Sequence, residues 1–269
     1  MTQGLAVMHT TTRVVTILIL MWLVSVPSIS FSHIKQESQA NATQNKSIIY
    51  ATFIPPTKWN AVDESLLSPR VLAAYVNRSS TGFLPSINLA IENTDLTLKE
   101  YLRHAKALHQ SDTKTRWREL GQFLTKTGKG QLTAIDTESK WGPVRMLQLI
   151  MMSNKKAYIL TASASKADFP FFHGQFKNAF SSFAITEDLT SMVHPTEKRK
   201  ELSIYLETFE KEISTLNQKN HDPDALNHLW TTLYQFLDKD HHEMGSYWRL
   251  QILKMLKTRV NSLITAKDG

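Results

Sequence analysis

Apolar residues between positions 47 and 190 gather in short runs that polar and turn-forming residues separate. Runs of this length predict β-strands. The last two runs are divided by Ser153, Asn154, Lys155 and Lys156, a spacing that predicts a hairpin with a four-residue loop. The predicted strands cover residues 48–53, 71–76, 87–91, 121–124, 132–135, 144–152 and 157–162.

Two amphipathic patterns interrupt these strands. Thr97 and Glu100 have the spacing of a capping box, and apolar residues then recur on one face as far as Leu108. A second helix is predicted after Asp168, with Pro170 in its first turn and a stripe of phenylalanines behind it. A sheet must cover its apolar faces, so we expect both helices to pack on the sheet.

From residue 196 the apolar period changes from two to about 3.5. Two further amphipathic segments begin at Asp222-Pro223 and after Gly245. Three such helices with short connections predict an antiparallel bundle over residues 195–269, whose first helix could offer a seam to a partner helix. The seam consists of Leu202, Leu206, Phe209, Ile213 and Leu216.

The front of the chain predicts a secretory signal peptide over residues 1–32. Arg13 precedes an apolar run of 13 residues, 14–26, and the small residues Ser30 and Ser32 follow it. The run is shorter than the ~20 residues of a membrane span. We therefore expect export to the periplasm or the exterior, a flexible linker over 33–46 and an α/β domain over 47–190. An uncleaved segment, which would tether the protein to a membrane, is the alternative.

The positive charge of the chain is concentrated in its middle. Residues 33–195 contain 19 Lys and Arg against 13 Asp and Glu, whereas residues 196–269 contain 11 of each. A basic surplus suits an acidic partner, and a peripheral membrane contact stays open. No arginine-rich run or basic-aromatic interleaving is present, so we expect no nucleic acid. The absence of cysteine excludes disulfides, thiol catalysis and a lipid-modified cysteine.

Several segments occur in the order found in PsbP-type and DcrB-type domains. They are Pro55-Pro56 with Trp59, residues 85–89, the capped helix at Thr97, residues 142–145, residues 157–162 and the aromatic helix that ends at 180–183. The chain resembles these domains over about residues 47–186. The resemblance implies an α+β fold in which helices layer an antiparallel sheet, and an exported binding or assembly module without catalysis. It transfers no functional residues, and the C-terminal helices are an addition.

A serine hydrolase is the alternative from another functional class. Residues 163–166 fit S-x-x-K, residues 126–128 fit K-T-G, and Ser111-Asp112-Thr113 could complete the set. Their order along the chain is wrong, because the nucleophile motif should come first. We therefore expect no enzymatic activity and no catalytic residues.

Metal and phosphate sites are not predicted either. Adjacent histidines such as His241 and His242 point about 100° apart on a helix, so we interpret this segment as a solvated turn. We interpret Gly128-Lys129-Gly130 as a hairpin turn, because it lacks the spacing of a phosphate-binding P-loop. We expect no cofactor. Asn41, Asn45 and Asn77 are N-glycosylation acceptor triplets whose use depends on the host.

The candidate binding surface is a basic face around one tryptophan. Trp117 stands among cations and could dock on a surface, with a core anchor as the alternative. The predicted site comprises Lys99, Arg103, Lys106, Lys114, Arg116, Trp117 and Arg118. We predict an exported, non-enzymatic module of the cell envelope that engages an acidic partner through this face and other proteins through its helices. A secreted effector or surface protein is the remaining alternative.

Overall fold

The computed structural model describes residues 48–79, 81–218 and 223–265 of the 269-residue chain. The predicted signal peptide, the linker and the acceptors Asn41 and Asn45 lie outside the described residues. No helix among the described ranges is long and apolar enough to cross a membrane.

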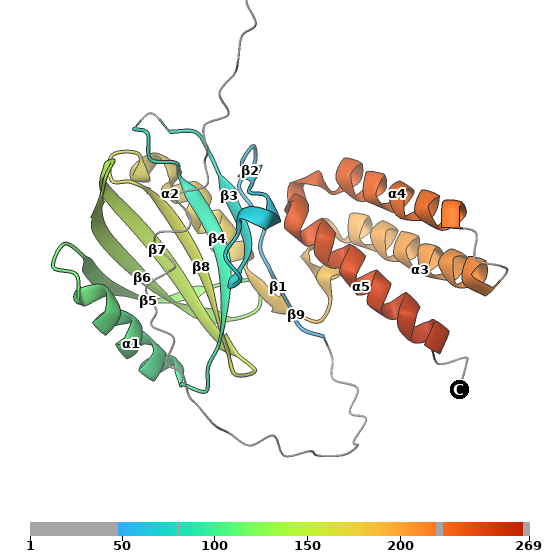
Figure 1. Ribbon diagram of the computed structural model, residues 1–269, viewed down its shortest axis with the longest axis horizontal. Helices are drawn as coiled ribbons and strands as arrows, with labels where there is room; N and C mark the ends of the chain where they lie inside the picture. The colour runs from blue at the N-terminus through green and yellow to red at the C-terminus, as the bar shows by residue number, and fades with distance from the viewer. Residues whose placement is uncertain (1–47, 80, 219–222, 266–269) are drawn as a thin grey trace, which may run out of the picture.

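A seven-stranded antiparallel sheet occupies one half of the molecule (Figure 1). The central strand of this sheet, β8, is buried at nearly every position and successive side chains point to opposite faces, so both faces need a cover. The order across the sheet is β2 (Asn60–Ala61), β3 (Val71–Val76), β4 (Ser86–Asn93), β8 (Lys156–Ser165), β7 (Gly142–Ser153), β6 (Lys129–Ser139) and β5 (Arg116–Leu124). All seven predicted runs are strands, although β1 (Tyr50–Thr52), the first of them, pairs outside this sheet.

The hairpin between β7 and β8 is tighter than the sequence predicted. Ser153 and Lys156 pair with each other, so the loop contains only Asn154 and Lys155. Both residues have positive φ, 49° and 57°, as a two-residue type I′ turn requires. The four-residue loop was therefore wrong, because polar residues at the strand ends were counted as loop.

One helix covers each face of the sheet. The capping box of α1 (Leu98–Gln110) is confirmed, since the Glu100 N–H donates to Thr97 Oγ1 and Glu100 Oε2 accepts from the Thr97 N–H. Leu102 packs with Trp117 and Ile135 on this face. The opposite face packs against α2 (Phe169–Ser182). The buried residues of α2 are Phe169, Phe172, Phe176, Ala179 and Phe180.

Trp59, the residue before β2, joins this strand to α2. The indole is 8% exposed and meets Phe172 and Phe176 edge to face. Its Nε1 donates to Gln175 Oε1 at 2.7 Å. The side chain therefore fixes the short edge strand over the second covering helix.

The C-terminal helices form the other half of the molecule (Figure 1). They are α3 (Thr196–Gln218), α4 (Pro223–Asp240) and α5 (Gly245–Thr265). Their core also contains Tyr50 of β1 and Ala184 of β9 (Ala184–Thr186), which pair as a two-stranded sheet. The predicted fold class, an antiparallel sheet layered with helices and followed by C-terminal helices, is confirmed.

The start of α5 approaches the sheet half closely. Gly245 has φ +81°, and a Cβ there would lie 2.6 Å from Pro55 Cγ and 2.7 Å from the Tyr75 hydroxyl oxygen. That hydroxyl oxygen accepts from the Tyr247 N–H, and the Trp248 indole donates to Leu189 O at 3.0 Å. Glycine is therefore required where the two halves meet.

Candidate functional site

The predicted basic face divides around strand β5. Lys99, Arg103 and Lys106 are exposed on α1, which covers one face of the sheet. Arg116 and Arg118 alternate with Trp117 along β5, so their side chains belong to the opposite face, on the side of α2. Lys114 lies in the loop before β5. The seven residues thus surround one sheet edge from two sides and do not form a single face.

Trp117 is a core residue and not a docking aromatic. Its side chain is 6% exposed and packs with Leu102 and Ile135. Lys106 Nζ lies 5.9 Å from the centre of its ring. The alternative that the sequence left open, a core anchor, is therefore the correct one, because strand alternation turns Trp117 under α1.

Two of the predicted arginines belong to a cluster that the sequence did not reveal. Arg116 stands opposite Asp136 on β6, and Asp136 stands opposite Arg145 on β7. Arg145 donates twice to Asp136, from Nε to Oδ1 at 2.6 Å and from Nη2 to Oδ2 at 2.9 Å. Arg118 Nη2 reaches Oδ2 at 3.3 Å. We call Arg116, Arg118, Arg145 and Asp136 the arginine cluster.

One carboxylate is thus shared among several cations. The Arg145 hydrogen bonds hold the pKa of Asp136 below its ordinary value, and nearby Lys166 and Arg118 add to the effect. The Arg145 guanidinium also lies over the Phe169 ring, 5.5 Å from its centre. A preorganised surplus of guanidinium groups favours carboxylate or phosphate ligands.

The hairpin register is the signal that could have found this cluster. A turn at Lys140 and Trp141 places residues 136 and 145 opposite each other. Asp136 and Arg145 would then have been a cross-strand ion pair, and Arg116 would have followed once β5 was extended to its true start. The exposed charges of β5 concealed that start.

The serine-hydrolase motifs do not come together. The Ser163 hydroxyl contacts the Ser86 hydroxyl at 2.8 Å and lies on the α1 face of β8. Lys166 acts electrostatically on Asp136, which lies on the α2 face. Lys126 Nζ contacts His194 Nε2 at 2.6 Å and follows the edge strand β5, whereas Ser163 belongs to β8, from which β7 and β6 separate that edge. Nothing in these contacts activates Ser163 as a nucleophile.

The histidine-rich turn is not fully solvated, which corrects the sequence interpretation. His241 is 1% exposed and packs between Phe236 and Trp248, whereas His242 is exposed. Burial lowers the pKa of His241. No three His, Asp or Glu side chains among the described residues could hold a metal ion together. A hairpin turn is present near Gly128, where the Thr125 N–H donates to Gly128 O, but it ends at that residue: Lys129 and Gly130 pair with β5 as the start of β6.

A cavity lies where α5 meets the sheet. It has a volume of about 180 Å³ and is lined mainly by apolar side chains, with Tyr75, Tyr247 and Glu64 at its polar points. Pockets for drug-sized ligands begin at about 300 Å³. The cavity is therefore a junction between the two halves and not a substrate cleft.

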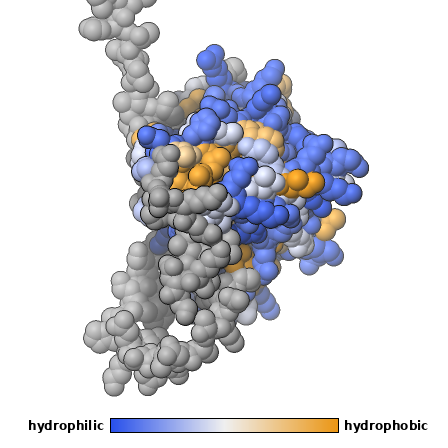
Figure 2. Space-filling model, turned by 90° about the vertical axis from the view of Figure 1, so that its right-hand side faces the viewer, coloured by the Kyte–Doolittle hydropathy of each residue, from blue (hydrophilic) through white to orange (hydrophobic). Residues whose placement is uncertain are grey.

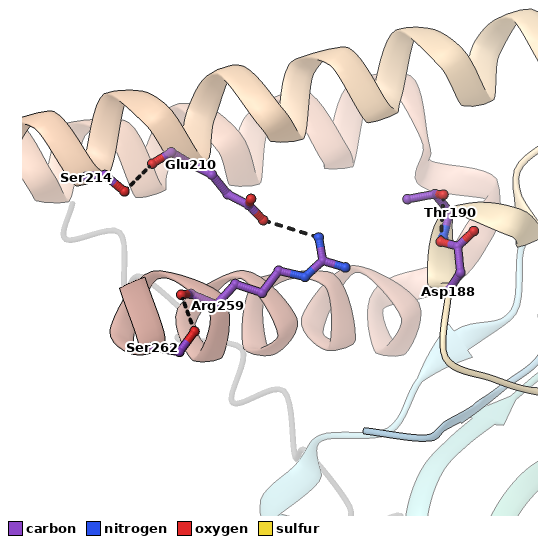
Figure 3. Close-up of polar contacts among 6 residues, drawn as sticks. All are labelled: Asp188, Thr190, Glu210, Ser214, Arg259 and Ser262. Carbon is purple, nitrogen blue, oxygen red and sulfur yellow. Dashed lines mark hydrogen bonds and ion pairs between the residues drawn. The ribbon is translucent and has the colours of Figure 1, made fainter. Parts of the chain in front are cut away.

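The predicted helical seam is occupied by the bundle itself. Leu202, Leu206, Phe209 and Ile213 are buried against α4 and α5, so these residues are not free for a partner helix. The described part of the bundle end in Figure 2 is mostly hydrophilic, with small separate apolar patches. Its exposed large apolar side chains include Ile204 and Tyr234. Figure 3 shows Arg259 of α5 reaching Glu210 of α3, with 3.3 Å between Nη1 and Oε1.

No protein-family model matches the chain, and no curated protein matches it in sequence. Solved structures are similar. LpqN of Mycobacterium tuberculosis, involved in cell envelope biogenesis, has 13% identity and a TM-score of 0.41 over 54% of this chain and 87% of LpqN. The cyanobacterial PsbP of Synechocystis sp. PCC 6803 has 13% identity and a TM-score of 0.35 over 55% and 98% of the two chains.

The Ran-binding protein Mog1p of Saccharomyces cerevisiae has 16% identity and a TM-score of 0.31 over 50% of this chain and 89% of Mog1p. A PsbP is thus among the similar structures, as the sequence resemblance implied. At TM-scores below 0.5, these similarities establish neither a family nor a function for this chain.

Proposed function

We propose that this protein is an exported, non-enzymatic binding or assembly module of the cell envelope that engages an acidic partner through the arginine cluster. The observation that carries the proposal is the sharing of Asp136 between Arg145 and Arg118, with Arg116 directly across from it. The cluster has more positive charge than its single carboxylate can neutralise.

The exposure of the cluster supports an external ligand. The side chain of Arg118 is 47% exposed and that of Arg145 is 30% exposed, whereas Asp136 is only 15% exposed. The carboxylate therefore lies beneath the guanidinium groups and orders them. Arg116 is exposed and makes no ion pair among the described residues. An incoming carboxylate can reach the arginines without displacing Asp136.

The cations of α1 extend this basic region around the edge of the sheet. Lys99, Arg103 and Lys106 are exposed on the other side of β5. They form no hydrogen-bonded cluster comparable to that of Asp136, so we assign them to long-range attraction and the arginine cluster to contact. This division gives the two groups different expected effects.

Retention on an acidic matrix tests the proposal. The purified chain is applied to immobilised polyglutamate, and elution is followed against salt. Salt at about 0.1 M and above screens contacts between surface charges and so elutes the protein. We expect the double variant R116E/R118E to elute at clearly lower salt than the parent chain, because it lacks two of the arginines that hold the matrix. The matched control, K211E/K254E, makes the same change in charge on exposed positions of the bundle.

Two results of this experiment would contradict the proposal. Equal elution of R116E/R118E and the parent chain contradicts a binding role for the cluster. Equal losses in both variants show that only the net charge matters, which also contradicts it. Circular dichroism spectra establish that each variant keeps its fold.

Export is the second part of the proposal, and the apolar segment over residues 14–26 supports it. Cells that express the chain are separated into cytosol, membranes, periplasm and medium. We expect a shortened form outside the cytosol that begins near His33 when its N-terminus is sequenced. An intact precursor that stays in the soluble cytosol contradicts export.

A further inference from the structure

We propose that the outer edge of β5 is a strand-addition site for an extended acidic segment of a partner protein. This inference rests on the proposed function and specifies how the acidic partner binds. A strand at the edge of a sheet presents unpaired N–H and C=O groups that can pair with another strand. Such pairing would bring the side chains of the added strand beside those of β5.

Strand β5 is a long edge. It has nine residues and pairs only with β6. No backbone hydrogen bond of the described residues joins its outer side to another segment. The other edge strand of the sheet, β2, has two residues and is fixed to α2 through Trp59. Of the two edges of the seven-stranded sheet in the described part of the chain, only β5 therefore offers a template of useful length.

The positive charge along β5 favours an acidic partner strand. Arg116 and Arg118 lie two residues apart on one face of this edge, so an added strand would place alternate side chains beside them. Carboxylates at those alternate positions would meet both guanidinium groups. On the opposite face of the edge, Lys106 lies over Trp117 and adds positive charge. An extended segment with acidic residues at every second position would place its carboxylates on the face of Arg116 and Arg118, and its remaining side chains on the Lys106 face.

The second half of β5 adds apolar contacts. A bulge between Glu119 and Gly121 breaks the regular pairing with β6 and divides the edge. Beyond it, the side chain of Leu124 is 69% exposed, and Leu120 in the bulge is 49% exposed. We expect the acidic positions of the partner to pair beside residues 116–119 and its apolar positions to lie near Leu124.

A second copy of this chain is a poorer occupant. Antiparallel pairing of two β5 strands would bring four arginines and only two glutamates into one interface. The arginines would repel each other at the positions where the acidic segment is attracted. Self-association is therefore an outcome that contradicts the proposal.

A fluorescent ten-residue peptide in which glutamate alternates with valine is the probe. Its binding to the full chain is measured by fluorescence anisotropy at about 0.1 M salt. Two versions carry N-methyl groups, one on the valines and one on the glutamates. Each removes the donors of one edge of the peptide and leaves every charge in place. A third version has the same composition with all glutamates in one block.

We expect the alternating peptide to bind, and one N-methylated version to bind at least about tenfold more weakly, because its backbone donors are lost. The blocked-charge peptide should also bind more weakly. R116E/R118E should lose at least about tenfold in affinity, whereas K99E/R103E on α1 should lose less, since its charges act at a distance.

Each contrary result has a distinct meaning. If both N-methylated peptides bind as well as the parent peptide, strand addition is wrong, while the proposed function survives as binding by charge alone. If no acidic peptide binds but polyglutamate retention still depends on Arg116 and Arg118, the strand site is again wrong. If neither probe depends on these arginines, the inference and the proposed function both fail. Dimerisation through β5, seen by analytical ultracentrifugation and abolished in R116E/R118E, also overturns the acidic partner.

Discussion

The helical bundle and the sheet half of the molecule arrange their charges in different ways. In the bundle half, cations and carboxylates pair one to one: Lys198 with Glu243 at 2.8 Å, Arg249 with Asp238 at 2.8 Å and Arg259 with Glu210 at 3.3 Å. The sheet half also has one-to-one pairs, Arg70 with Glu92 and Lys155 with Asp95. It differs in that Asp136 is shared between Arg118 and Arg145, with Arg116 opposite.

The one-to-one pairs neutralise each other within the fold, whereas the arginine cluster keeps a positive charge that a ligand can neutralise. Exposed one-to-one pairs contribute little to stability and leave little net field. A shared carboxylate leaves a positive surplus in a fixed geometry, which an external anion can neutralise. The binding surface is therefore expected where charges are unbalanced, and the bundle is expected to serve mainly through its shape and its attachment to the sheet.

The largest expected effect tests whether both regions unfold together. Trp248 is 1% exposed in the bundle core and donates to Leu189 O in the segment that joins the halves. We expect W248A to lower the free energy of unfolding by about 3–5 kcal/mol in a single transition. Urea denaturation followed by circular dichroism measures it. Two separate transitions would show that the halves are independent. The control is Y234A, since Tyr234 is 51% exposed.

A smaller effect is expected from removing the shared carboxylate. D136N removes the negative charge and one of the two oxygens that accept from Arg145, so we expect the free energy of unfolding to fall by about 1–3 kcal/mol. The same variant should bind polyglutamate more tightly, because we expect the loss of a competing negative charge to outweigh the looser ordering of the guanidinium groups. Thermal unfolding and matrix retention measure the two effects.

The matched control is D95N, which makes the same change in charge and breaks the Lys155 pair, in which both side chains are 83% exposed. We expect a change within about 1 kcal/mol and no change in retention. Weaker retention of D136N than of the parent chain would contradict the role assigned to the cluster.

The pH dependence of stability should separate the regions further. Burial lowers the pKa of His241, with Lys198 adding to the shift and Glu243 opposing it. Protonation therefore favours the unfolded chain: the stability is fully present above the unfolded pKa of about 6.5 and falls as pH drops through the folded pKa. The melting temperature should decrease between about pH 7.5 and pH 5.

Two variants isolate the contribution of His241. H241F should show a smaller decrease, because the phenyl ring keeps the packing between Phe236 and Trp248 and does not titrate. H242Q, at an exposed position of the same turn, should behave as the parent chain. An unchanged decrease in H241F would assign the effect to other groups, such as His109, whose pKa burial also lowers.

The smallest expected effect concerns a one-to-one pair of the bundle. E210Q removes the carboxylate that Arg259 contacts in Figure 3; the side chain of Arg259 is 53% exposed and that of Glu210 is 20% exposed. We expect the free energy of unfolding, obtained from the melting temperature, to fall by less than about 1 kcal/mol, and this decrease to become smaller in high salt. A loss as large as that of D136N would remove the distinction between the two kinds of charge arrangement.

Local patterns made most of the fold predictable from the sequence. The Thr97 capping box, the stripe on α2 and the 3.5-residue period after residue 196 depend on neighbours along the chain, and the structure contains all three. The tertiary partners of the short apolar runs were harder to predict. Tyr50 belongs to a strand that pairs with β9 and packs into the bundle, which nothing near Tyr50 in the sequence indicates.

The candidate site was only half predictable for the same reason. Arg116 and Arg118 were identified from their charge, but a list of cations does not say on which face each lies. Alternation along β5 separates them from Trp117 and from the cations of α1. Register across two hairpins then adds Asp136 and Arg145. Both steps require strand boundaries that exposed, charged edge residues conceal.

The close approach at Gly245 also fixes a distance. The bundle meets the sheet at the β2 and β3 side, whereas β5 lies at the far edge (Figure 1). Six strand spacings of about 4.8 Å separate the two edges, roughly 29 Å in all. A ligand bound at β5 and a ligand bound to the bundle would thus be separated by the width of the sheet. The molecule could therefore hold two binding partners at a fixed distance from each other.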